Sequence, residues 1–321
     1  MKVLVIGAGA IGQVFGYSFA MGGAAVTFLT RPKYAAAARA GFVLYPMNRG
    51  SSSRHTPVRF SEFSVATDQD EAMKEAWDVI VIALSSVALR SGDWFDRLCS
   101  SLGDAQLLSL LAGSDDPPYI LERLPAEKVS WGMLAVISFQ APLPGQELPE
   151  AGIAFWFPWL SKLGFSGSNL EFLPVLRRGG MPVAAIDSVQ RDVAFTGAIL
   201  DKTIYALEAS GWTFSGLIAD RELFSLAVAA MHESWTLATA VHGVKRPFAL
   251  GLIWPMHLRM ILRLAPWIMP FDLERFFHFH YQKVGEQQLL HLRTQVEMCA
   301  ENGVDNPAMR ELLDRLERAR A

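Results

Sequence analysis

A glycine pattern near the N-terminus constrains the fold of this chain more than any other feature. Residues 7–12 have the pattern G-x-G-x-x-G and follow the apolar run Lys2–Ile6. The pattern alone is common, but a strand before it and a helix after it form the context that binds a dinucleotide. Gly7 permits the tight turn, Gly9 lets the backbone approach a pyrophosphate, and Gly12 lets helix and strand pack closely. We therefore predict a strand over 2–6, a helix over 13–21 and a dinucleotide site at their junction.

The N-terminus of that helix is the expected binding site of the phosphates. A pyrophosphate at this position would lie against the backbone of Ala10 and Ile11, at the positive end of the helix dipole. A glycine-rich turn without a ligand is the alternative. A membrane span is a second alternative, because no charged residue lies between Val3 and Thr30. Six glycines in that run favour a strand, a turn and a packed helix over a helix that faces lipid.

Charge around the second apolar run indicates which dinucleotide binds. An NAD site usually has an acidic residue about 20 residues after the glycines, which binds the ribose 2′-hydroxyl. Here no Asp or Glu precedes Glu62, and Thr30-Arg31 ends the run. A 2′-phosphate needs a cation and no carboxylate, so Arg31, with help from Lys33, predicts NADP. A solvated arginine at a helix start is the alternative role for Arg31.

Further apolar runs alternate with helical stretches through the first half of the chain. We predict strands over residues 25–29, 77–84, 106–111 and 129–137. This alternation is typical of an α/β fold with a doubly wound parallel sheet. After residue 185 the pattern turns helical, with long helices expected over 187–210, 217–242, 272–302 and 307–320. The predicted organisation is a dinucleotide-binding Rossmann domain over 1–185 and an all-α domain over 186–321 for substrate binding or dimerisation.

Composition excludes several other functions. Cys99 and Cys299 are the only cysteines, which excludes a disulfide scaffold and any four-cysteine metal site. The histidine spacing gives no metal site either, so we expect no metal. The net charge is −3, and no basic excess suggests nucleic acid as a partner. We expect no membrane partner and a cytoplasmic location. A homodimer is compatible with the sequence.

Along its whole length the chain resembles the ketopantoate reductase (2-dehydropantoate 2-reductase) family. The resemblance rests on the glycine motif, Thr30-Arg31, the run 78–84, the run 107–113 and the segment 301–307 before a final helix. It implies a Rossmann domain joined to a helical domain like that of 6-phosphogluconate dehydrogenase. It also implies NADPH-dependent reduction of a 2-keto acid to a 2-hydroxy acid.

Three positions depart from the family pattern. The family's lysine after the third strand corresponds to Ser85-Ser86, and its Asn-Gly after the fourth strand corresponds to Ala112-Gly113. The family's catalytic lysine aligns with Phe195, which cannot donate a proton. Loops at the carboxyl ends of parallel strands line the cleft, so Leu84, Ser85 and Ala112 remain candidates for cofactor contact.

Other residues could replace the missing proton donor. Lys202 lies seven residues after Phe195, on about the same helix face, where it would either face the cleft or be solvated. His280 and Lys283 are three residues apart and neighbours on one helix face, and Gln287 continues that face. A histidine titrates near neutral pH, and a lysine can bind a carboxylate or act as an acid. A packed histidine beside a surface lysine is the alternative.

Aromatic residues crowd the segment from Phe248 to Tyr281, either as core or as an apolar substrate pocket or subunit interface. Our first hypothesis is an NADPH-dependent reductase acting on a small-molecule carbonyl compound, either 2-keto-acid-like or bulkier and apolar. The second is an NADP-binding sensor or interaction protein that has lost catalysis.

Overall fold

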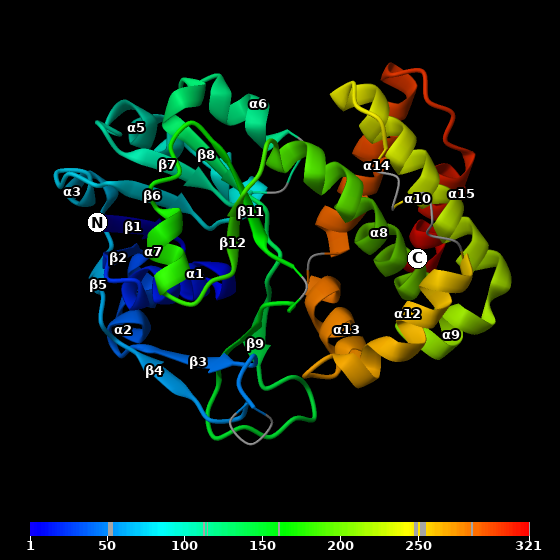
Figure 1. Ribbon diagram of the computed structural model, residues 1–321, viewed down its shortest axis with the longest axis horizontal. Helices are drawn as coiled ribbons and strands as arrows, with labels where there is room; N and C mark the ends of the chain where they lie inside the picture. Colours follow the sequence, from blue (N-terminus) through cyan, green and yellow to red (C-terminus); the bar gives the residue numbers. More distant parts are fainter. Residues whose placement is uncertain are drawn as a thin grey trace. The chain divides into compact units, whose positions relative to one another are not determined.

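The computed structural model describes residues 1–50, 54–111, 113, 115–159, 161–246, 250, 255–283 and 285–320. The chain divides into two compact units, Met1–Val189 and Gln190–Ala321. The first unit holds all the strands of the described residues, and the second is built from helices. Figure 1 shows both architectures, with the strands at the blue-to-green end of the colour bar.

The first unit is built on a sheet whose described strands run in the order β12-β11-β8-β7-β6-β1-β2-β5. All neighbours pair in parallel except β8 and β11. The strands are β1 (Lys2–Ile6), β2 (Ala25–Leu29), β5 (Ser64–Ala66), β6 (Val79–Ile82), β7 (Gln106–Ser109), β8 (Val129–Gly132), β11 (Leu163–Gly167) and β12 (Val183–Ala185). The predicted parallel, doubly wound sheet is confirmed.

Helices cover this sheet and explain why its central strands β1 and β6 are mostly apolar. The longest is α1 (Ala10–Met21), which packs against β1, β2 and α7 (Leu173–Arg178). Val3, Leu4 and Val5 of β1 are fully buried, as expected for a strand covered on both faces. The other helices are α2 (Pro32–Arg39), α3 (Gln69–Ala72), α4 (Ser86–Leu89), α5 (Trp94–Ser100), α6 (Asp116–Leu121) and the 3₁₀ turn η2 (Ala126–Lys128).

A second sheet, which the sequence analysis did not predict, also belongs to this unit. Its described strands run in the order β4 (Val58–Phe60), β3 (Phe42–Pro46), β10 (Gly152–Trp156) and β9 (Ile137–Ala141). The predicted single strand over 129–137 is therefore wrong, because β8 ends at Gly132 and β9 begins in the other sheet. Phe28 of β2 stacks edge-on against Phe42 of β3 at 5.1 Å, so aromatic contacts tie the two sheets together.

The described helices of the second unit are α8 (Val189–Ala209, which starts at the division), α9 (Phe214–Ala219), α10 (Arg221–His242), α12 (Pro255–Ile268), α13 (Leu273–Lys283), α14 (Gly285–Glu301) and α15 (Pro307–Arg320). The helix predicted over 217–242 begins later, at Arg221, because Asp220 caps it by accepting a hydrogen bond from the Leu223 amide at 2.9 Å. Glu233 of α10 accepts from the amides of Ala308 and Met309 and so holds the start of α15.

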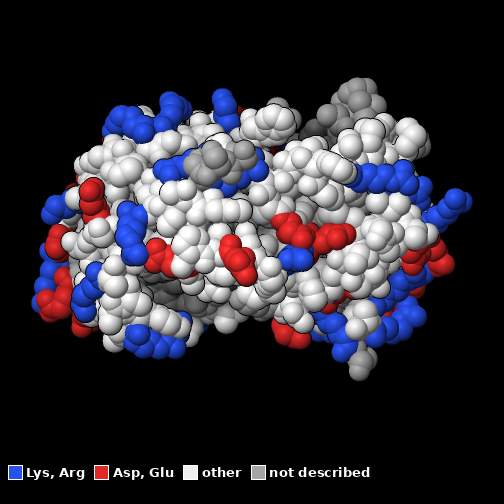
Figure 2. Space-filling view, turned by 90° about the horizontal axis from the view of Figure 1, so that it is seen from below, with Lys and Arg blue, Asp and Glu red and all other residues white. Residues whose placement is uncertain are grey.

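Surface charge is mixed on the face that Figure 2 shows. Among the described residues visible there, Lys and Arg side chains form small groups between acidic side chains and broad uncharged areas. No helix in the described part of the chain is long and apolar enough to cross a membrane.

Candidate functional site

The glycine turn between β1 and α1 is too tightly packed for any larger residue at two of its three glycines. Gly7 has φ +106°, and a Cβ there would lie 2.6 Å from the carbonyl oxygen of Ala83. A Cβ on Gly12 would lie 1.9 Å from the carbonyl oxygen of Gly7. At Gly9 a Cβ would meet nothing within 4 Å. The turn is thus closed against the sheet and open at Gly9, the position where a ligand approaches the backbone.

The start of α1 offers backbone donors to that open side. Gly9 is the N-cap and has no side chain to satisfy the first amides of the helix. The side-chain amide of Gln13 donates to the carbonyl of Ala8 at 2.9 Å and so leaves these amides unsatisfied. Ala10 and Ile11 are half-buried. This arrangement can hold an anion such as a pyrophosphate.

Arg31 lies two residues after the end of β2, the strand beside β1, and is the N-cap residue of α2. Its side chain is exposed, and its guanidinium carbon lies 5.3 Å from the centre of the Tyr34 ring. Lys33 contacts the same ring at 4.9 Å. Within the described residues no carboxylate lies within ion-pair distance of Arg31. The structure thus places a cation without an acidic neighbour at the strand end where a ribose substituent would lie.

Two further cofactor candidates come from the segment after β6. Leu84 is half-buried, and its Cδ2 atom lies 2.7 Å from the place that a Cβ on Gly7 would take. Ser85 is exposed and caps α4 by accepting from the Ala88 amide at 3.2 Å. Ala112 lies outside the described residues. Leu84 therefore touches the glycine turn, while the hydroxyl of Ser85 is engaged in helix capping.

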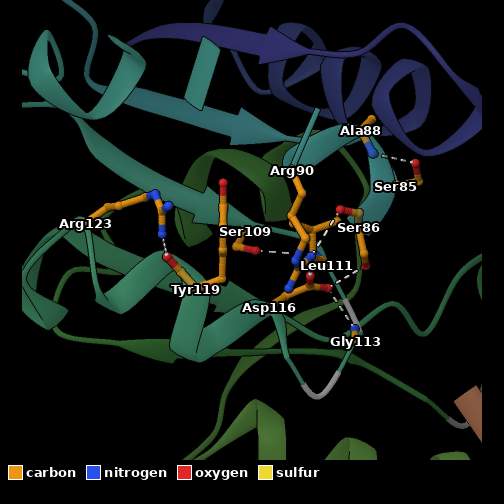
Figure 3. Close-up of polar contacts among 10 residues, drawn as sticks. All are labelled: Ser85, Ser86, Ala88, Arg90, Ser109, Leu111, Gly113, Asp116, Tyr119 and Arg123. Atoms are coloured by element: carbon orange, nitrogen blue, oxygen red, sulfur yellow. Dashed lines mark hydrogen bonds and ion pairs between the residues drawn. The ribbon is translucent and has the colours of Figure 1, made fainter. Parts of the chain in front are cut away.

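A buried carboxylate joins the segments that follow β6 and β7, and Figure 3 shows its contacts. Asp116 accepts hydrogen bonds from Ser86 Oγ at 2.7 Å and from the Gly113 amide at 3.0 Å. Its other oxygen accepts from Arg90 at 2.5 Å. Arg90 also stacks on Tyr119, with its guanidinium carbon 4.7 Å from the ring centre. The sequence analysis did not single out Asp116 or Arg90.

In the helical unit, Phe195 occupies the position where the sequence comparison expected a lysine. Its side chain is buried, and its carbonyl accepts a hydrogen bond from Trp235 Nε1 at 2.9 Å. The position is therefore part of the helix packing, with no proton to donate.

Lys202 is not solvated, contrary to one of the two predictions made for it. It is 0% exposed and donates a hydrogen bond to Gln295 Oε1. Gln295 Nε2 lies 3.0 Å from His291 Nε2, and His291 Nδ1 lies 3.9 Å from Asp201 Oδ2. We call Asp201, Lys202, His291 and Gln295 the polar cluster. It runs from the interior to His291, whose side chain is 34% exposed.

Burial shifts the pKa values of Lys202 and of two tyrosines that feel the charge of Asp201. It lowers the pKa of Lys202 to about 8, because the charged form loses its hydration. Burial also raises the pKa of Tyr205 well above its ordinary value, and the negative charge of Asp201 adds to this effect. The pKa of Tyr281 on α13 is raised for the same two reasons. A lysine with a pKa near neutrality has a proton that it can give up under ordinary conditions.

The other predicted donors lie on α13. His280 is half-buried, with its ring stacked on Phe276 at 5.2 Å and edge-on to Tyr281 at 5.0 Å. The side chains of Lys283 and Gln287 lie outside the described residues, as does Val284 between α13 and α14. Both ring contacts of His280 are with residues of α13 itself.

Sequence reasoning missed His291, Gln295 and Asp201. Their spacing carries a signal only in part, because His291 and Gln295 are four apart on one helix and so face the same side. Asp201 precedes Lys202, but the sequence does not indicate that α8 and α14 pack together.

Of the aromatic segment, Phe271, Phe276 and Phe277 are buried as core, while Trp267 is 89% exposed and Trp254 lies outside the described residues. Within the described residues no group of three His, Cys, Asp or Glu is placed to hold a metal ion.

Comparison with known proteins agrees with this geometry. Residues 3–146 match the family described as ketopantoate reductase PanE/ApbA. A search of curated protein sequences gives no significant match.

Several solved structures share the fold over almost the whole chain. One is a 2-dehydropantoate 2-reductase from Geobacter metallireducens GS-15, with 16% identity, a TM-score of 0.69 and coverage of 99% of this chain and 100% of that one. A PanE/ApbA family ketopantoate reductase from Ralstonia eutropha JMP134 has 17% identity, a TM-score of 0.71 and coverage of 99% and 98%. A D-mandelate dehydrogenase with NADH and anilino(oxo)acetate has 13% identity, a TM-score of 0.70 and coverage of 99% and 98%.

Replacing Lys202 with methionine is expected to stabilise the protein at pH 7. The folded pKa of about 8 lies below the ordinary 10.5, so burial of the charged lysine penalises folding fully below pH 8. As pH rises from 8 towards 10.5, the folded lysine releases its proton before the unfolded one, and the penalty disappears. The difference between the folded and the ordinary pKa corresponds to roughly 3 kcal/mol of folding free energy. Loss of the hydrogen bond to Gln295 in the variant offsets about 1 kcal/mol of this gain.

Urea unfolding at pH 7 and pH 9.5 measures this difference. Lys202→Met should be more stable than the unsubstituted protein at pH 7, with the advantage shrinking at pH 9.5. The exposed Lys245→Met serves as the control and should change neither value. A Lys202→Met variant that is less stable at pH 7 would contradict the prediction.

Proposed function

Because residues 3–146 belong to the ketopantoate reductase PanE/ApbA family, we propose that this chain is an NADPH-dependent reductase of a small carbonyl compound. The observation that carries the proposal is the glycine turn, closed at Gly7 and Gly12 and open at Gly9, with Arg31 at the end of the next strand. The substrate class is a 2-keto acid or a bulkier apolar ketone. A cytoplasmic location is part of the proposal, and two free thiols suit that reducing compartment.

The described residues fit an NADP molecule. The open backbone at Gly9 and the first amides of α1 would hold the pyrophosphate. Arg31 would bind the 2′-phosphate, since no acidic residue precedes Glu62 to repel it. When bound, the reduced nicotinamide would supply a hydride to the carbonyl carbon. A nearby proton donor must then neutralise the carbonyl oxygen as its charge develops.

We propose that the polar cluster supplies this proton. His291 is the partly exposed end of the cluster, and its Nδ1 lies 3.9 Å from Asp201 Oδ2. Lys202 holds Gln295, which in turn fixes the imidazole of His291. A buried lysine whose pKa is lowered by burial is a candidate functional residue. The earlier candidates His280 and Lys283 remain alternatives for the same role.

Retention of nucleotide binding without catalysis is the second candidate function. It is favoured by Phe195, because a buried phenylalanine stands where the family has its catalytic lysine. A chain of this kind would bind NADPH and turn over no carbonyl substrate.

Arg31→Ala should weaken NADPH binding by about 10- to 100-fold, the loss expected for a charge-assisted contact to phosphate. NADH binding should change less than twofold, because NADH lacks the 2′-phosphate. Titration calorimetry with both nucleotides measures the two affinities. Arg39→Ala, at the other end of α2, is the matched control. Equal effects of Arg31→Ala on both nucleotides would refute a contact to the 2′-phosphate.

His291→Asn should lower kcat at least 100-fold on any carbonyl compound that the enzyme reduces, with the Kd for NADPH unchanged. The control is His278→Asn, which lies on α13 and stacks on Trp212. His280→Asn and Lys283→Met test the alternative donors in the same assay. Full activity of His291→Asn, with loss in either of those variants, would move the proton donor to α13.

We also propose a homodimer formed through α12. Apolar side chains on its outer face are exposed, among them Trp267, Met256, Met260 and Leu264. Leu258 and Leu262 on the opposite face are buried. A contiguous exposed apolar face is typical of an interaction site. A second copy of the chain would remove this face from water.

Replacing Met260 and Leu264 together with glutamate should convert the dimer to a monomer, because charges would then be buried in the interface. Light scattering after size-exclusion chromatography gives the mass. Leu290→Glu, an exposed apolar position on α14, is the control and should leave the dimer intact. A monomeric unsubstituted protein at micromolar concentration would exclude the proposed dimer.

A further inference from the structure

One carboxylate, that of Asp116, accepts three hydrogen bonds in an almost completely buried position. The donors are the hydroxyl of Ser86, the backbone amide of Gly113 and the guanidinium of Arg90. The Asp116 side chain is 1% exposed. Figure 3 shows the three donors converging on it from different directions. A buried charge is tolerated only when it is paired and hydrogen-bonded in this way.

The contacts tie two loops together. Ser86 and Arg90 belong to the segment that follows β6, and Gly113 and Asp116 to the segment that follows β7. Arg90 strengthens the link by donating also to the carbonyl of Ser86 at 3.1 Å. The relative position of the two segments is therefore set by the Asp116 carboxylate together with the strand pairing of β6 and β7.

Gly113 is needed for this contact in a direct steric sense. A Cβ on Gly113 would lie 2.6 Å from Asp116 Oδ2 and 3.2 Å from Ser86 Oγ. Since heavy atoms do not approach a Cβ that closely, any larger residue at this position would push the carboxylate away. Ser86, which follows β6, and Gly113 and Asp116, which follow β7, thus pack tightly against one another.

The order of strands indicates which part of a dinucleotide these loops would meet. The sequence β7-β6-β1-β2 puts the glycine turn after β1 and Arg31 after β2. A dinucleotide with its pyrophosphate at the turn and its adenosine ribose at Arg31 extends its other half in the opposite direction, over the ends of β6 and β7. That half carries the nicotinamide.

We infer that Asp116 is a positioning residue that fixes Ser86, which follows β6, and Gly113, which follows β7, in the arrangement that receives the nicotinamide half of the cofactor. The inference rests on the proposed NADPH-dependent function. It gives the buried Asp116 carboxylate and its partner Arg90 a role in the cofactor site. Asp116 acts through Ser86 and Gly113 and does not itself touch the cofactor.

Removing the charge of Asp116 should affect the two halves of the cofactor site differently. Asp116→Asn leaves Arg90 without its counter-charge. The asparagine side chain has one acceptor oxygen where the aspartate has two, so it cannot accept all three hydrogen bonds, and Ser86 and Gly113 lose their fixed arrangement. The glycine turn and Arg31 lie after β1 and β2 and are not contacted by Asp116. Binding of the adenosine half should therefore survive while binding of the nicotinamide half weakens.

The test compares NADPH with adenosine 2′,5′-bisphosphate, which lacks the nicotinamide half, by titration calorimetry on the full chain. We expect Asp116→Asn to weaken NADPH binding at least tenfold and to change bisphosphate binding less than twofold. Gly113→Ala should give the same pattern by displacing the carboxylate, and Ser86→Ala a smaller one. Asp115→Asn is the matched control. The double variant Arg90→Gln with Asp116→Asn restores a neutral pair and should recover part of the NADPH affinity.

Each outcome decides between the role of Asp116 and the proposed function. Unchanged NADPH binding in Asp116→Asn and Gly113→Ala would overturn the inference, and so would equal weakening of both ligands, which a merely structural role predicts. If Asp116→Asn does not fold, Gly113→Ala and Ser86→Ala still give the ratio of the two affinities. Failure of the unsubstituted protein to bind either ligand would overturn the proposed function, and the inference with it.

Discussion

The close approach of the glycine turn to the end of β6 is the contact on which the candidate site depends. Gly7 lies where a Cβ would strike the carbonyl of Ala83, and Gly12 lies where a Cβ would strike Gly7 itself. These contacts let α1 start directly over the end of β1, so that its unsatisfied amides face outward at Gly9. Any larger residue at Gly7 or Gly12 would separate helix and sheet and remove the cradle.

Two buried charges organise the rest of the polar chemistry, one in each unit. Asp116 is compensated by three donors from two loops, whereas Lys202 is held by one described hydrogen bond to Gln295. Burial lowers the pKa of Lys202 to about 8, because its charged form loses hydration. The three hydrogen bonds of Asp116 instead fix the geometry around it.

In the helical unit, one helix, α8, carries both Phe195 and the buried Lys202. Phe195 is absorbed into the packing of α8 and α10, where its carbonyl receives the Trp235 indole. Two turns further along the same helix, Lys202 and Asp201 form a polar cluster with α14. The lysine expected at position 195 is thus absent, and the buried lysine of this helix is Lys202, which has different neighbours.

The sequence by itself determined the glycine turn between β1 and α1, the first parallel strands and the helical second half, because these follow from local patterns: glycine spacing, apolar runs and helical periodicity. It also predicted Arg31 after β2. Only the tertiary structure decided the second sheet, in which β3 pairs with β10 more than 100 residues away. The same holds for the burial of Lys202, its link to His291 and the contacts of Asp116. Each of these joins segments that are distant in sequence, and no local periodicity records which distant side chain will meet a buried charge.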